Sequence, residues 1–113
     1  MDDKIRQGDL YDFYGMLLNE HQRSIYEDYV LNDLSLGEIA ENEGISRQGV
    51  HDLVKRCTQQ MESFESKMHL IMKFQLVREN VNRINQLLDS SDELPRDRRL
   101  DLQKLTREIL EEI

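Results

Sequence analysis

Residues 46–60 contain the side chains of this chain that are best suited to contacting a polyanion. Within this segment Arg47, Lys55 and Arg56 are accompanied by a single acidic residue, Asp52. Arginine and lysine neutralise phosphate groups, so a nucleic acid is the polyanion that the pattern favours. The whole chain is acidic, with 23 acidic residues, 15 basic residues and a net charge of −8. That balance argues against broad nonspecific affinity for nucleic acids and leaves residues 46–60 as the place for a local contact.

Other kinds of chemistry have little support among the residue types. His21, His51 and His69 are 30 and 18 positions apart and have no cysteine at ligand spacing, so we expect no metal site. The one cysteine, Cys57, falls on an apolar helical stripe, which favours a buried and inert thiol over a nucleophile. The chain has no glycine-rich phosphate loop and no convincing Ser-His-Asp arrangement. We therefore expect neither an enzyme nor a bound cofactor.

The size and composition predict one small helical domain with a helical extension. The chain has 113 residues, only five glycines and one proline, and its longest apolar runs are triplets. Such runs are too short for a membrane span or for the core of a signal peptide. A single cysteine fits a reducing compartment. These features together predict a cytoplasmic, all-α protein.

A helix-turn-helix motif is predicted over residues 35–53. Ser35 and Glu38 form a capping box, and four apolar or small positions then match the inward face of the motif. Gly44 stands at the turn between the two helices, four positions after the small residue needed at their crossing. The inward positions are Ala40, Ile45, Val50 and Leu53, with Ile39 as a further apolar position. The alternative is a plain pair of antiparallel helices in a bundle.

Helical periodicity accounts for the rest of the chain. It predicts helices over about residues 7–18, 19–31 and 36–43, with a capping box at Asn19, and a last helix that starts at Pro95. From Val50 to Ile71 apolar residues recur in steps of four and three, as in a helix that packs along its length. A bend or a new helix is expected near Ser66. We predict a helix-turn-helix domain over residues 1–60 and, over residues 61–113, a C-terminal extension that packs on it or dimerises.

The motif resembles a known family. Residues 17–61, which include Leu-Ser-Leu-Gly-Glu-Ile-Ala-Glu and Gly-Ile-Ser-Arg-Gln-Gly-Val, are similar to region 4 of bacterial sigma factors. With Asp-Phe-Tyr-Gly at residues 12–15 and the segments 68–70 and 74–76, the whole chain resembles the YlxM family of small helix-turn-helix proteins of Gram-positive bacteria. Glu43, where a bulky apolar residue is expected, and Gly49 depart from the family pattern. The resemblance implies an all-helical fold and no known enzymatic activity. It also implies a link to the signal recognition particle pathway, which rests on gene neighbourhood.

The sigma pattern, carried over by position, implies which side chains of the second helix of the motif face outward. Arg47 has the fork that matches guanine in a major groove, and Gln48 has the amide that matches adenine. Lys55 and Arg56 are candidates for phosphate contacts, and Arg23 at the entrance of an earlier helix is another. The alternative for each is a solvated helix surface. The predicted nucleic-acid-binding residues are Arg47, Gln48, His51, Lys55, Arg56 and Arg23.

Two functions agree with these features. The first is a DNA-binding regulator that uses the helix-turn-helix and binds weakly and with strong salt dependence. The second is a non-enzymatic adaptor of the signal recognition particle machinery that binds protein or RNA. The apolar stripe of residues 61–113 exceeds what one last helix can cover, so we also expect a homodimer assembled through the C-terminal half.

Overall fold

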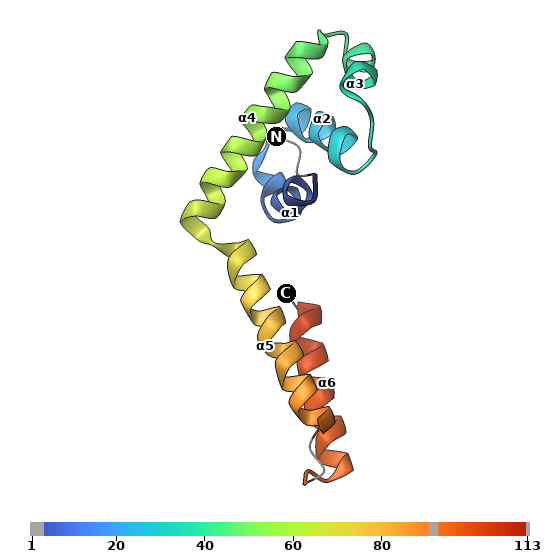
Figure 1. Ribbon diagram of the computed structural model, residues 1–113. Coiled ribbons are helices and arrows are strands. Elements are labelled where there is room, and N and C mark those ends of the chain that lie inside the picture. The colour runs from blue at the N-terminus through green and yellow to red at the C-terminus, as the bar shows by residue number, and fades with distance from the viewer. Residues whose placement is uncertain (1–3, 91–92, 113) are drawn as a thin grey trace. The chain divides into compact units, whose positions relative to one another are not determined.

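The computed structural model describes residues 4–90 and 93–112, and every regular element within them is helical. The all-α class predicted from the sequence is therefore confirmed. The elements are α1 (Lys4–Tyr14), the short 3-10 helix η1 (Gly15–Leu17), α2 (Glu20–Val30), α3 (Leu36–Glu43), α4 (Arg47–Met68), α5 (Leu70–Ser90) and α6 (Arg96–Glu112) (Figure 1). They form two compact units, the first ending at Ile71 and the second beginning at Met72. None of the described helices is both long and apolar enough to cross a membrane.

Side-chain caps determine where α2, α3 and α4 begin. Asn19 and Ser35 each accept a hydrogen bond from the backbone three residues later, and each receives the reciprocal bond in its own capping box. Both predicted capping boxes are therefore confirmed. Ser46 caps α4 by accepting a bond from the Gly49 N–H at 2.9 Å. Such caps satisfy backbone N–H groups that have no partner inside the helix.

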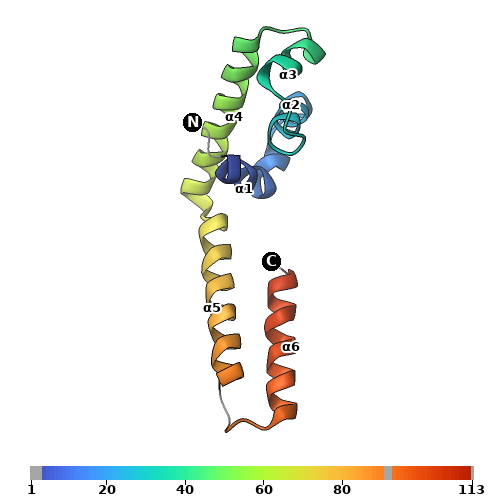
Figure 2. The same ribbon diagram turned by 45° about the vertical axis from the view of Figure 1, so that its right-hand side comes forward.

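The core of the first unit lies between α4 and the three helices that precede it. Both views show α1, α2 and α3 along one side of α4 (Figures 1 and 2). Each element contributes fully buried side chains. Val50, Val54, Cys57 and Met61 of α4 are buried as the heptad spacing predicted, whereas Phe64 is half-buried and Met68 is 38% exposed. The most deeply buried residues of this core are Leu10, Tyr14, Ile25, Tyr26, Ile39, Val50, Cys57 and Met61.

The end of α1 differs from the sequence prediction. The predicted helix continued to about residue 18, whereas α1 ends at Tyr14 and Leu17 is 52% exposed. The 3-10 turn of η1 changes the angular step between residues, so the buried position passes to Leu18. Gly15 is part of the reason, because a Cβ atom there would lie 2.6 Å from the ring of Tyr11.

The junction between α4 and α5 is a single residue with a left-handed backbone. His69 has φ 56°, and α4 is continuous as far as Met68, so the break predicted near Ser66 lies three residues later. The buried carboxylate of Glu65 accepts hydrogen bonds from the Tyr14 hydroxyl and, at 3.0 Å, from the Ile71 N–H. The Tyr14 hydroxyl accepts in turn from the Leu70 N–H at 3.2 Å. These bonds join α1 to the junction and satisfy the first N–H groups of α5.

The second unit is a pair of antiparallel helices. α6 runs back beside α5, and two hydrogen bonds join them, from Gln103 Nε2 to Asp89 at 2.6 Å and from Thr106 Oγ1 to Asn85 at 2.6 Å (Figure 2). Val81 and Thr106 are buried. Two helices cover only one face of each other, and many apolar side chains of this unit remain exposed. The large ones that are at least 40% exposed are Met72, Leu76, Ile84, Leu87, Leu100, Leu102, Leu105 and Ile109.

Candidate nucleic-acid interface

The first three turns of α4 present one polar face to solvent. Successive residues of an α-helix are about 100° apart, which places residues 47, 48, 51, 52, 55 and 56 within about half of the circumference. Arg47, Gln48, Lys55 and Arg56 are exposed and His51 is half-buried. The buried side chains of α4 occupy the opposite half. We call this polar half of residues 47–56 the α4 face. It brings together five of the six residues predicted to bind nucleic acid.

The helix-turn-helix that supports the α4 face has the predicted internal contacts at most positions. Ile39, Ala40 and Val50 are buried, and Gly44 adopts φ 68° at the turn. A left-handed backbone is favourable for glycine, and the turn is closed by a bond from the Ile45 N–H to the Ala40 carbonyl at 3.1 Å. Ile45 differs from the expectation, because it is 39% exposed.

Two further positions of the motif fit its geometry only in part. Leu53 is half-buried and packs against the core from its edge. Glu43, which departs from the family pattern, is the last residue of α3 and is also half-buried. The helix therefore ends early enough for this carboxylate to remain in contact with solvent.

Arg23 is the predicted residue that the structure places on a different element. It lies in α2, and its interaction with the Tyr11 hydroxyl of α1 raises the pKa of Arg23. The same Tyr11 hydroxyl donates to the Glu27 carboxylate. Arg23 is thus part of a contact between α1 and α2 as well as an exposed cation.

Asp52 also lies on the α4 face, although the sequence analysis assigned it no role. Its Oδ1 accepts a hydrogen bond from Gln48 Nε2 at 2.9 Å and lies 3.5 Å from His51 Nδ1. The bond from Gln48, and then that from His51, lower the pKa of the Asp52 carboxyl. Asp52 therefore holds Gln48 in place and adds a negative charge among the bases. The spacing of four residues between a glutamine and an aspartate on one helix was the available signal.

Beside Asp52 the α4 face is slightly hollowed. Gly49, Asp52, Lys55, Arg56 and Gln59 line a shallow, open depression. Two cations, Lys55 and Arg56, therefore lie beside the Asp52 carboxylate in the lining of this depression.

The described residues include no cluster of metal ligands, and the single cysteine is buried. Within residues 4–90 and 93–112, no three side chains of histidine, cysteine, aspartate or glutamate gather as metal ligands do. Cys57 is completely buried, and desolvation raises the pKa of its thiol, so the reactive thiolate is disfavoured.

Comparison with known proteins agrees with this geometry. A family model matches residues 1–100, and its description reads "Putative helix-turn-helix protein, YlxM / p13 like". The chain belongs to the UPF0122 family. This membership confirms the family resemblance and the helix-turn-helix class inferred from the sequence.

Several UPF0122 proteins match most of the chain. One from Thermoanaerobacter sp. (strain X514) is 44% identical over 104 residues, which are 92% of this chain and 87% of the relative. One from Caldanaerobacter subterraneus subsp. tengcongensis is 48% identical over 79 residues, covering 70% of this chain and 68% of the relative. One from Bacillus mycoides is 45% identical over 87 residues, covering 77% of this chain and 79% of the relative.

Proposed function

We propose that this UPF0122 protein is a non-enzymatic, cytoplasmic regulator that binds DNA through the first turns of α4. The observation that carries the proposal is the α4 face, where five candidate contact residues lie together next to the capped start of a helix. The start of the second helix of a helix-turn-helix is the part that enters the major groove. The family description supports the same assignment.

The charge of the chain limits how strong this binding is. We expect about four phosphate contacts, for which Lys55 and Arg56 on α4 and Arg23 on α2 are the named candidates, whereas the net charge is −8. Each neutralised phosphate contributes about −0.9 to the slope of log affinity against log salt concentration, so we expect a slope of about −3.6. Binding is therefore weak at physiological salt, and a dimer strengthens it by presenting two α4 faces.

The first prediction concerns Arg47. We expect Arg47→Ala to lower affinity for the best-bound genomic DNA fragment by about 1–3 kcal/mol, because a bidentate contact to a guanine edge is lost. Lys55→Ala should lower the affinity for all DNA fragments by a similar factor. It should also reduce the magnitude of the slope of log affinity against log salt concentration by about 0.9. Mobility shift over a salt series measures both effects.

Arg83→Ala is the matched control, since Arg83 is an exposed arginine of α5 outside the motif. We expect its affinity and salt slope to equal those of the wild type. If Arg47→Ala bound DNA as tightly as the wild type, or if Arg83→Ala lost as much affinity as Arg47→Ala, the proposal that the α4 face binds DNA would be wrong.

A second prediction concerns oligomeric state. We propose that the protein is a homodimer assembled through its C-terminal extension, residues 61–113, with residues 1–60 as the helix-turn-helix domain. The exposed apolar side chains of α5 and α6 support this assembly, since a monomer rarely leaves several hundred Å² of contiguous apolar surface in water. Sedimentation equilibrium at micromolar concentration should give twice the chain mass of 13.5 kDa. A single species of 13.5 kDa would contradict the dimer.

The same exposed apolar residues favour a second candidate function. In this alternative the protein is an adaptor of the signal recognition particle machinery, and a partner protein or RNA takes the place of the second copy. The mobility shift separates the two functions when small cytoplasmic RNA is run beside genomic DNA. Tighter binding of that RNA, together with a monomeric chain, would favour the adaptor.

A further inference from the structure

The α5–α6 pair has one polar face and one apolar face. The two hydrogen bonds that join the helices, at Asn85 and Asp89 of α5, lie on the polar face. This face carries Arg78, Asn82, Asn85, Asp89, Gln103 and Arg107. Successive residues of a helix are about 100° apart, and in this antiparallel pair the sides beyond the buried Val81 and Thr106 face the same way. Those sides form the apolar face, whose residues are Val77, Ile84, Leu88, Leu102, Leu105 and Ile109.

The apolar face has the residue spacing of the core of a helical bundle. Apolar residues recur in steps of four, three and four along residues 77–88, and in steps of three and four along residues 102–109. In a four-helix bundle each helix packs such a stripe against two neighbours, whereas here each helix has one neighbour within the described residues of the second unit. Val81 is therefore buried, but Ile84 and Leu105 remain 45% and 54% exposed. The face is half of the core of a bundle.

The charges at the outer edges of the apolar face differ between the two helices. The bonds between the helices place residues 80–90 of α5 beside residues 101–111 of α6. Within these two stretches the outer edge of α5 carries Arg83, and the outer edge of α6 carries Asp101 and Glu108. All three side chains are exposed. The apolar face thus has one basic edge and one acidic edge.

A second copy can cover this face in two symmetric ways. A twofold axis parallel to the helices lays α5 of each copy on α6 of the other, whereas a perpendicular axis lays α5 on α5 and α6 on α6. The first way brings the basic edge beside the acidic edge, and the second brings like charges together. A parallel axis also keeps residues at the same height. Arg83 lies two residues before Asn85, and Glu108 lies two residues after Thr106, its bonded partner, so Arg83 is level with Glu108 of the partner subunit.

We propose that the apolar face binds a second copy of this chain in a four-helix bundle, in which α5 of each copy packs on α6 of the other and Arg83 pairs with Glu108 of the partner subunit. The arrangement rests on the homodimer proposed above and specifies the face that it uses. Ile84, Leu105 and Ile109 then lie in the core of the bundle, and the polar face stays in contact with solvent. A different protein would have to match both apolar stripes and both charged edges, whereas this chain matches them itself.

Reversing the two charges one at a time tests the arrangement. Arg83→Glu places acidic edges together and Glu108→Arg places basic edges together, twice in each dimer, so each variant alone should raise the dissociation constant of the dimer about tenfold. In an equimolar mixture of the two variants, every pair in the heterodimer is again of opposite charge. The mixture should therefore dimerise as the wild type does, which an ion pair within one chain would not achieve. Sedimentation equilibrium of the full-length proteins over a concentration series measures each sample.

Arg78→Glu is the matched control, since it makes the same change of charge on the polar face of α5. Its dissociation constant should equal that of the wild type. Arg83→Ala removes an exposed ion pair and adds no repulsion, so it remains suitable as the control for DNA binding.

Two kinds of result would contradict the proposal. A monomeric wild type would overturn the homodimer together with this arrangement. A dimeric wild type would overturn the arrangement alone if the single variants dimerised normally, if their mixture stayed weak, or if Arg78→Glu lost as much affinity as Arg83→Glu.

Discussion

Replacing Ile39 with alanine is expected to lower the free energy of unfolding by about 2–5 kcal/mol. Ile39 is completely buried at the centre of the contact between α3 and the rest of the first unit. Its truncation removes apolar contacts and leaves a cavity that close-packed neighbours fill only in part. Denaturant titration followed by circular dichroism measures the loss.

Ile45→Ala is the matched control for this prediction. Ile45 has the same side chain and belongs to the same motif, but it is 39% exposed. We expect its truncation to cost clearly less than that of Ile39, because part of the side chain already contacts water. Equal losses at the two positions would show that α3 does not pack as described, and the helix-turn-helix geometry would fail with it.

Glu65→Ala is expected to lower the free energy of unfolding by about 2–4 kcal/mol. The Glu65 carboxylate accepts from the Tyr14 hydroxyl and from the Ile71 N–H, and all three groups are buried. Removing the acceptor leaves two buried donors without their partner, each at a cost of about 1–3 kcal/mol. Thermal and urea unfolding of the variant measure the effect.

Two further variants test whether the loss of stability in Glu65→Ala comes from its buried hydrogen bonds. Glu62→Ala, three residues earlier in α4, removes a partly exposed carboxylate that pairs with Arg6 at 2.7 Å and 3.1 Å. A pair of this kind contributes about 1 kcal/mol or less, so we expect a small loss. Glu65→Gln keeps an oxygen acceptor and should recover part of the stability lost in Glu65→Ala. A larger loss in Glu62→Ala than in Glu65→Ala would contradict the buried bond at the junction.

The sequence predicts the local features of the fold because their causes are local. The capping boxes at Asn19 and Ser35 and the turn at Gly44 depend on residues three or four positions apart. The break after α1 was missed because it depends on the ring of Tyr11 lying over Gly15. The burial of Gln7 and Glu65 could not be predicted, because their hydrogen-bond partners, Thr58 and Tyr14, are 51 positions away along the chain.

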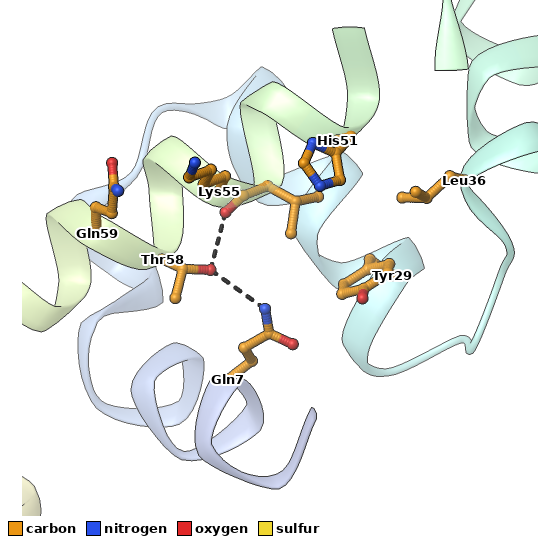
Figure 3. Close-up of a pocket in the computed structure, with 8 residues that line it drawn as sticks. Gln7, Tyr29, Leu36, His51, Lys55, Thr58 and Gln59 are labelled. Carbon is orange, nitrogen blue, oxygen red and sulfur yellow. Dashed lines mark hydrogen bonds between the residues drawn. The ribbon is translucent and has the colours of Figure 1, made fainter. Parts of the chain in front are cut away.

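The candidate site also has some features that the sequence predicts and others that it does not. Helical spacing alone places Arg47, Gln48 and Lys55 on one side of α4, so the α4 face could be predicted. The bond that Asp52 accepts from Gln48 requires particular rotamers, and the contact of Arg23 with Tyr11 requires the packing of α1 on α2. Neither interaction can be predicted from the spacing of residues along one helix alone. The pocket lined by Gln7, Tyr29, Leu36 and Val54 is formed by four helices (Figure 3), so the spacing of residues along any one helix does not predict it.

Because Cys57 is buried, the reaction of its thiol with a reagent reports how often the first unit opens. The chain has one cysteine, it is 0% exposed in the middle of α4, and burial raises the pKa of its thiol. A thiol reagent therefore reacts only with molecules in which α4 has transiently separated from the other helices. The rate at which the chain gains one adduct mass under native conditions measures how often that separation occurs. No engineered label is needed, and a ligand that holds these helices together lengthens the lifetime of the unmodified chain.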